Sequence, residues 1–239
     1  MNAHTREPAL NLPGTIIFVI AVLIAIHAAT VLSSLEWRFW AIEQFAFTPA
    51  RAVIPDGGPQ SVWMWLTYAL LHGDGVHLTV NALWLAIFGT PVIRRLGTAR
   101  FAALSIAGAL GAAALHLATH WGAANPMIGY SGVVSALTGA AARFAFVGGG
   151  GPAGIGFDGP RLSIPGTFLK RASLGFVVVW MVANLLSGSG LLTPEGPRIA
   201  WEAHVGGFLV GLVLFGWFDR YSEPSPTNVS DDPSETSDR

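Results

Sequence analysis

The residues best suited to chemistry in this sequence are a serine and a histidine that lie far apart in the chain. Ser131 stands between glycines in the stretch GYSG, and His204 lies in the apolar stretch IAWEAHVGGFLVG. A serine hydroxyl is a weak nucleophile until a base within hydrogen-bond reach accepts its proton, and a neutral histidine suits that task. We therefore predict that Ser131 is a nucleophile and His204 its general base, provided that the fold brings them together.

Three further residues could stabilise the negative charge that such a reaction creates. His77 and Asn81 form an i, i+4 pair, so both project from one face if this stretch is helical. An imidazole, an amide and the backbone N–H groups at a helix start can each donate to an oxyanion. Gly129 would let backbone, rather than a side chain, lie against a substrate carbonyl.

A carboxylate that would complete a triad is not evident from the sequence. Glu202 precedes His204 by two residues. On a helix, that spacing makes the two side chains project about 200° apart. We therefore predict a Ser-His dyad.

The composition indicates which elements must carry these residues. The 239 residues are 52% hydrophobic and 11% charged, with a mean hydropathy of +0.53, which is too apolar for an ordinary soluble domain. The net charge of −1 and the scattered Lys and Arg argue against a nucleic-acid partner. The chain has no cysteine, which excludes disulfides, thiolate catalysis and cysteine-ligated metals. A polytopic membrane protein is the expected class.

Membrane-spanning helices need about 20 mainly apolar residues. Six stretches meet this condition and predict an all-α bundle of six transmembrane helices: 14–33, 76–93, 99–119, 130–147, 171–190 and 200–218. We expect the first to be an uncleaved helix rather than a signal peptide, because its apolar run is long. The predicted domain is 14–218, preceded by a polar N-terminus at 1–13 and followed by a disordered tail at 219–239. The aromatic-rich segment 34–75 is expected to lie in the membrane interface.

The distribution of basic residues predicts the orientation of the bundle, because cytoplasmic loops retain Lys and Arg. With the N-terminus inside, ten of the 13 basic residues fall on the cytoplasmic side and only Arg38, Arg51 and Arg198 fall outside. Both termini are therefore expected in the cytoplasm. The second, fourth and sixth helices then start at the outer face, which places Ser131 and His204 at one depth with the His77–Asn81 pair. Polar groups in lipid are costly unless they face partners or a wet cavity.

Rows of small residues predict how the fourth and sixth helices meet. The sixth carries Ala203, Gly207 and Gly211 at four-residue spacing. The fourth carries a similar row from Gly132 through Ala136 to Ala140. Such rows let helix backbones approach closely in a membrane, which would allow the serine to reach the histidine.

Each of these residues also has a structural explanation when taken alone. Ser131 could cap or back-bond to its own helix, His204 could be a polar packing residue, and Asn81 could join two helices. His116 and His120 have the i, i+4 spacing of a metal pair, but neither an HExxH motif nor a carboxylate completes them in the sequence. We therefore predict no metal and no cofactor.

Three motifs together resemble those of the rhomboid family of intramembrane serine proteases. They are HLTVNALWLAIFG, GYSG and AHVGGFLVG, in the family's order, and the likeness extends over roughly residues 15–218. The resemblance implies a six-helix fold and cleavage of transmembrane substrates near their outer ends. It assigns Ser131 as nucleophile, His204 as general base and acid, and His77 and Asn81 as oxyanion donors. A bacterial cytoplasmic membrane is the expected location.

The sequence departs from the family pattern at several positions. Trp63-Met64 replaces a Trp-Arg pair, and Ile93 replaces the Glu of a G-x-x-x-E pattern, so both possible partners of an ion pair are missing together. Ser135 replaces a tyrosine that packs on the histidine in some members, so the resemblance does not say what orients His204. The alternative function is a catalytically silent binder or transporter with the same scaffold, which would hold a client helix in the polar cavity.

Overall fold

The structure is a computed structural model that describes residues 11–54, 58–147, 156, 158–189, 191 and 199–220. Most of the predicted N-terminal segment 1–13 and nearly all of the predicted tail 219–239 lie outside the described residues. The described residues form a helical bundle, whose elements follow in chain order. They are α1 (Gly14–Val31), α2 (Leu35–Phe45), α3 (Pro49–Val53), α4 (Gln60–Thr67), η1 (Tyr68–Leu70), α5 (Gly75–Trp84), η2 (Leu85–Gly89), α6 (Thr90–Leu96), α7 (Thr98–Thr119), α8 (Ser131–Ala141), α9 (Ile164–Leu169), α10 (Arg171–Gly188) and α11 (Trp201–Phe218).

Among the described residues, five helices are long and apolar enough to cross a membrane, which confirms an all-α, multi-pass architecture. They are α1, the continuous helix Gly75–Leu96 formed by α5, η2 and α6, and then α7, α10 and α11. The π-helical segment η2 within the second span was not predicted by the sequence pattern. Each of the five lies within a few residues of its predicted boundaries.

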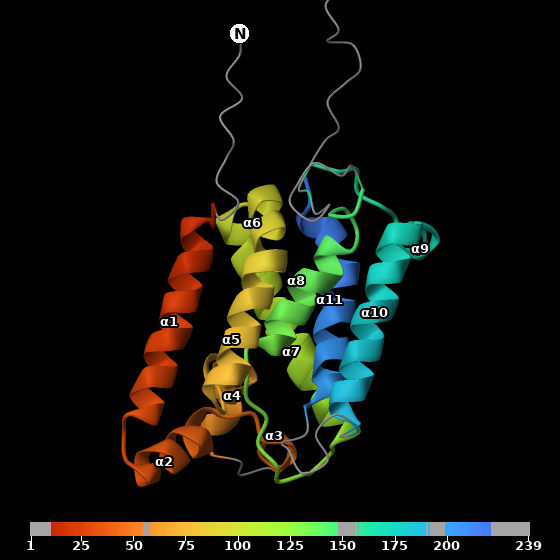
Figure 1. The fold of residues 1–239 in the computed structure, drawn as a ribbon. Coiled ribbons are helices and arrows are strands. Elements are labelled where there is room, and N and C mark those ends of the chain that lie inside the picture. The colour runs from red at the N-terminus through yellow and green to blue at the C-terminus, as the bar shows by residue number, and fades with distance from the viewer. Residues whose placement is uncertain are drawn as a thin grey trace, which may run out of the picture.

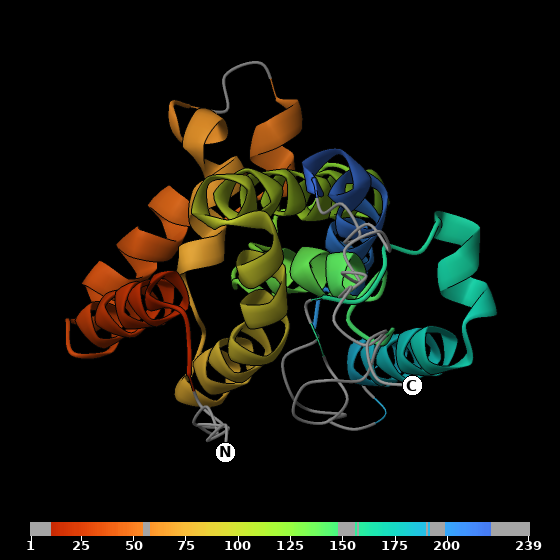
Figure 2. The ribbon, with the colours of Figure 1, turned by 90° about the horizontal axis from the view of Figure 1, so that it is seen from above.

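The predicted fourth span, 130–147, is shorter than expected. It is realised as α8, which has 11 residues and therefore extends about 16 Å, roughly half the thickness of a bilayer core. Every residue of α8 after Ser131 is buried. Figures 1 and 2 show α8 in the middle of the bundle, with α5, α7 and α11 around it. A helix enclosed by protein need not span the bilayer, because protein rather than lipid surrounds its ends.

Glycines allow α8 and α11 to pack with their backbones in direct contact. A Cβ on Gly207 would collide with the carbonyl oxygen of Gly132, and one on Gly211 would collide with the carbonyl oxygen of Ala136. On the opposite helix, a Cβ on Gly139 would collide with the carbonyl of Phe208. The predicted close approach of these two helices is therefore confirmed.

The segment between the first two spans folds into α2, α3, α4 and η1 rather than into an extended loop. Several of its aromatic side chains remain partly exposed, with Trp37, Phe39 and Trp40 all more than 40% accessible, whereas Phe47 and Tyr68 are buried. Exposed rings of this kind are typical of a membrane–water interface, and the interfacial position of the segment stays a prediction. The segment also contacts the chain just before α8, through an isolated antiparallel bridge between Phe47 and Met127.

We predict that Gly211→Ala weakens the fold while Gly175→Ala does not. Both glycines lie inside helices, but a Cβ on Gly211 meets the backbone of Ala136, whereas one on Gly175 meets no atom within 4 Å. Overpacking of this kind costs about 1–3 kcal/mol, while relief of glycine flexibility at an open helical site contributes about 0.5–1 kcal/mol. Thermal unfolding of the purified variants in detergent measures the difference. Equal midpoints would show that the α8–α11 contact does not limit stability.

Candidate active site

Ser131 and His204 meet between the starts of α8 and α11. The Oγ of Ser131 lies 2.8 Å from Nε2 of His204, which is hydrogen-bond distance. Ser131 is the first residue of α8, after Tyr130 at the N-cap position, and His204 lies in the first turn of α11. The serine side chain thus neither caps α8 nor remains within its own helix. This is the geometry of a hydroxyl placed beside its base.

A third residue, Asn184 of α10, contacts the other side of the histidine ring. Its Oδ1 lies 2.5 Å from Nδ1 of His204, and its Nδ2 donates to the carbonyl oxygen of Trp180 at 2.8 Å. Because Nδ2 is engaged by that carbonyl, the amide oxygen faces the imidazole and accepts from Nδ1–H. The tautomer with hydrogen on Nδ1 leaves Nε2 free to accept the serine proton.

Asn184 was missed by sequence reasoning. It lies in an apolar helix with no motif around it, and its contact with His204 joins residues 20 apart in the chain. Asn184 answers the question of what orients His204, which the resemblance left open. An amide holds the ring, and not an aromatic residue at position 135. Ser135 is buried within α8.

His77 and Gly129 lie beside the serine, with the histidine ring packed against the glycine. Gly129 has a φ of 125°, and a Cβ placed on it would lie 2.6 Å from Nε2 of His77 and 3.6 Å from Oγ of Ser131. Because glycine has no Cβ, the ring of His77 can lie against the backbone of residue 129, close to the serine hydroxyl. The Nε2 of His77 therefore lies on the same side of Gly129 as Oγ of Ser131.

Asn81 lies one turn after His77 on α5 and is buried. Its Nδ2 donates to the backbone carbonyl of His77 at 3.0 Å. This bond holds the amide on the face of α5 that carries His77, as the i, i+4 spacing predicts. The second N–H of the amide is the one that could donate to a ligand.

The loop before Ser131 is held in place by backbone bonds to the segment before α5. Phe47 and Met127 exchange two bonds of 3.0 and 2.8 Å, and the N–H of Gly129 donates to the carbonyl oxygen of Tyr68 at 3.0 Å. The Tyr68 phenol is itself buried and donates to the carbonyl of Ala109 on α7. These contacts fix the positive-φ glycine and therefore the start of α8.

The comparison with protein families agrees with the motifs and with this geometry. The family model described as "Rhomboid domain" matches residues 59–221 of the chain. The chain belongs to the rhomboid family.

Similar curated proteins are bacterial rhomboids of greater length. This rhomboid chain is 30% identical over 171 residues to "Rhomboid protease GlpG" of Pectobacterium atrosepticum, which covers 72% of this chain and 53% of that protein. It is 29% identical over 164 residues to "Rhomboid protease GlpG" of Yersinia pestis, and this match covers 67% of this chain and 50% of that protein. The chain thus spans about half the length of the curated relatives that it matches.

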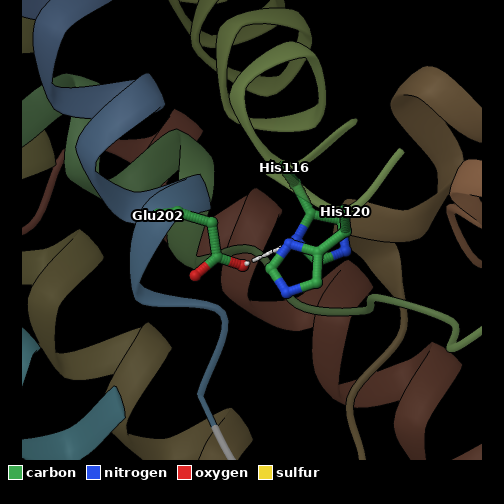
Figure 3. Close-up of side chains that lie close together, drawn as sticks. All are labelled: His116, His120 and Glu202. Carbon is green, nitrogen blue, oxygen red and sulfur yellow. Dashed lines mark hydrogen bonds and ion pairs between the residues drawn. The ribbon is translucent and has the colours of Figure 1, made fainter. Parts of the chain in front are cut away.

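A second polar cluster of this rhomboid lies where α7 ends and α11 begins. The carboxylate of Glu202 accepts from Nδ1 of His116 at 2.7 Å, and Nδ1 of His120 lies 3.6 Å from the same oxygen. Figure 3 shows the three side chains converging from the two helices. Glu202 therefore faces away from His204, as predicted. It also provides a carboxylate beside His116 and His120, which was not evident from the sequence.

His72 lies in the short connection between η1 and α5 and is buried beside the site. Its ring centroid lies 5.0 Å from that of His77, and its Nε2 accepts from the N–H of Tyr130 at 3.5 Å. Burial lowers the pKa of His72 to about 4, and the neighbouring His77 acts in the same direction. These contacts are those of a neutral ring that supports the loop before α8.

We predict that this rhomboid loses stability as the pH falls below about 6.5, and that His72→Gln reduces the loss. The folded chain keeps His72 neutral down to about pH 4, whereas the unfolded chain protonates it near pH 6.5. The unfolded state therefore binds more protons in this window, and the free energy of unfolding falls with a slope of up to about 1.4 kcal/mol per pH unit. Unfolding midpoints of both chains between about pH 7.5 and 5 measure the effect. Parallel losses in the two chains would assign the pH dependence to other groups.

Proposed function

We propose that this chain is an intramembrane serine endopeptidase that cleaves peptide bonds in or near transmembrane segments of membrane proteins. The observation that carries the proposal is the 2.8 Å contact between Ser131 Oγ and His204 Nε2 at the centre of a multi-pass bundle. Membership of the rhomboid family and the names of the similar proteins support the same reaction class.

In the proposed mechanism, Ser131 and His204 perform the covalent chemistry. Nε2 of His204 accepts the hydroxyl proton while Oγ of Ser131 attacks the carbonyl carbon of the scissile bond. The resulting tetrahedral intermediate collapses as the C–N bond breaks and His204 returns the proton to the leaving nitrogen. A water molecule, deprotonated by the same histidine, then hydrolyses the acyl ester and restores the serine.

The oxyanion would lie beside the Ser131 hydroxyl, where His77 and Asn81 can donate to it. The Nε2 of His77 lies close to Gly129 and Ser131, and the remaining amide N–H of Asn81 projects from the same face of α5. The backbone N–H groups at the start of α8 add donors and the favourable end of the helix dipole. Preorganised donors of this kind stabilise the transition state by about 3–4 kcal/mol each.

Asn184 would act as a positioning residue in this reaction. By accepting from Nδ1–H, its amide oxygen holds the histidine in the tautomer whose Nε2 can accept a proton. Because the amide is anchored on its own helix through Trp180, the position of α10 sets the position of the base.

The orientation and location proposed for the chain follow from its charges. With both termini in the cytoplasm, the starts of α8 and α11 face the outside, and water and substrate ends reach the site from there. The chain is a multi-pass membrane protein. The bacterial origin of the similar proteins supports a cytoplasmic membrane as its location.

We predict that the purified full chain cleaves a generic single-span substrate in liposomes, and that Ser131→Ala and His204→Ala each reduce the rate at least about 1,000-fold. Ser131 is also expected to react with a fluorophosphonate, and Ser135→Ala, in the same helix, is the matched control that keeps this reaction. A folded chain that neither cleaves nor labels would instead support the silent client-binding scaffold.

We further predict that Asn184→Leu slows fluorophosphonate labelling and lowers kcat by about 10- to 100-fold, with little change in KM. Asn184→Asp keeps an oxygen that accepts from the histidine, so it should restore most of the lost rate. The labelling rate reports on the nucleophile without substrate binding. If Asp fails to rescue while the fold is intact, the residue acts through packing of α10 and not through the ring.

A further inference from the structure

The His116–His120–Glu202 cluster has a geometry that its hydrogen bond alone does not explain. Nδ1 of His116 and Nδ1 of His120 approach the same carboxylate oxygen, at 2.7 and 3.6 Å. The bond between His116 and Glu202 is complete without the second histidine. The two imidazole rings are stacked with centroids 4.5 Å apart and an angle of 22° between them, which brings both nitrogens to one side.

The three ligand atoms lie close to the spacing that one metal ion requires. One ligand atom from each residue lies within 4.8 Å of the others. Ligands at about 2.0–2.1 Å from a tetrahedral zinc ion stand roughly 3.3 Å apart, so small rotations of the side chains would suffice to bind one ion. Two histidines and one glutamate are a donor set that zinc sites use with a water as the fourth ligand.

Burial and access also fit an open metal site. The side chains of His116 and Glu202 are only 9% and 8% exposed, so the ion would be held by rigid groups. The side chain of His120 is 45% exposed, which leaves an entry path and room for a water ligand. The Oγ1 of Thr119, 3.0 Å from Nδ1 of His120, is the alternative polar partner of that nitrogen.

We propose that His116, His120 and Glu202 bind a divalent transition-metal ion of the zinc type, which links the end of α7 to the start of α11. The imidazole-rich donor set favours zinc, copper or nickel over magnesium or calcium. Because Glu202 lies two residues before His204, a bound ion would fix the turn of α11 that carries the histidine of the active site. The binding site itself does not depend on the proposed proteolytic activity.

The test uses the purified full chain in detergent, carrying an affinity tag without histidines and stripped of metal with a chelator. Zinc is the probe, and bound zinc is measured by equilibrium dialysis together with the unfolding midpoint. We expect one zinc ion per chain and a midpoint that rises with zinc concentration, because the ion binds only the folded state. His120→Ala, an exposed substitution that keeps the His116–Glu202 bond, should weaken zinc binding by about 10- to 100-fold or more.

Two controls separate this site from other histidines. His27→Ala, on α1, should bind zinc like the unaltered chain. His77→Ala removes a ring that lies near His72 in the active site. Zinc binding that survives His120→Ala but is lost in His77→Ala would place the ion at the active site and overturn the proposal. The proposal is also wrong if the unaltered chain binds no zinc, since His116 and Glu202 then form a hydrogen-bonded clamp only.

Discussion

Backbone contact between α8 and α11 is the constraint on which the rest of the bundle depends. Gly207 lies against the carbonyl of Gly132, and Gly211 against that of Ala136. Since lipid offers no hydrophobic force between helices, such close packing and its dispersion contacts must hold them together. His204 lies three residues before Gly207, just under one helical turn, and Ser131 lies directly before Gly132. The same contact therefore sets the distance between hydroxyl and imidazole.

The shortness of α8 follows from its enclosure and has a chemical consequence. A full span would carry its first residue to the membrane surface, whereas α8 begins within the bundle after a loop bonded to Phe47 and Tyr68. Irregular backbone at this depth is tolerated because protein groups satisfy its hydrogen bonds. The segment before α5 therefore forms the surface against which the loop carrying Gly129 and the start of α8 are placed.

The first turn of α11 presents two polar side chains to two different neighbours. His204 faces α8 and α10, where it contacts Ser131 and Asn184. Glu202, about 200° around the helix, faces the end of α7, where His116 bonds to it. His116 therefore compensates the buried carboxylate of Glu202 on one side of α11, while Asn184 orients the imidazole of His204 on the other. Both contacts come from partner helices, so the orientation of α11 within the bundle determines the chemistry on each side.

Sequence patterns were sufficient to predict the class of fold, five of the six spans, the close approach of two helices and the grouping of Ser131, His204, His77 and Gly129. These features follow from local properties: apolar length, small residues at four-residue spacing, and polar residues in apolar stretches. Three other features emerge only from the packed bundle: α8 is half a span, Asn184 holds His204, and Glu202 joins His116 and His120. Each depends on how helices distant in the chain are rotated and shifted against one another, which no local pattern encodes.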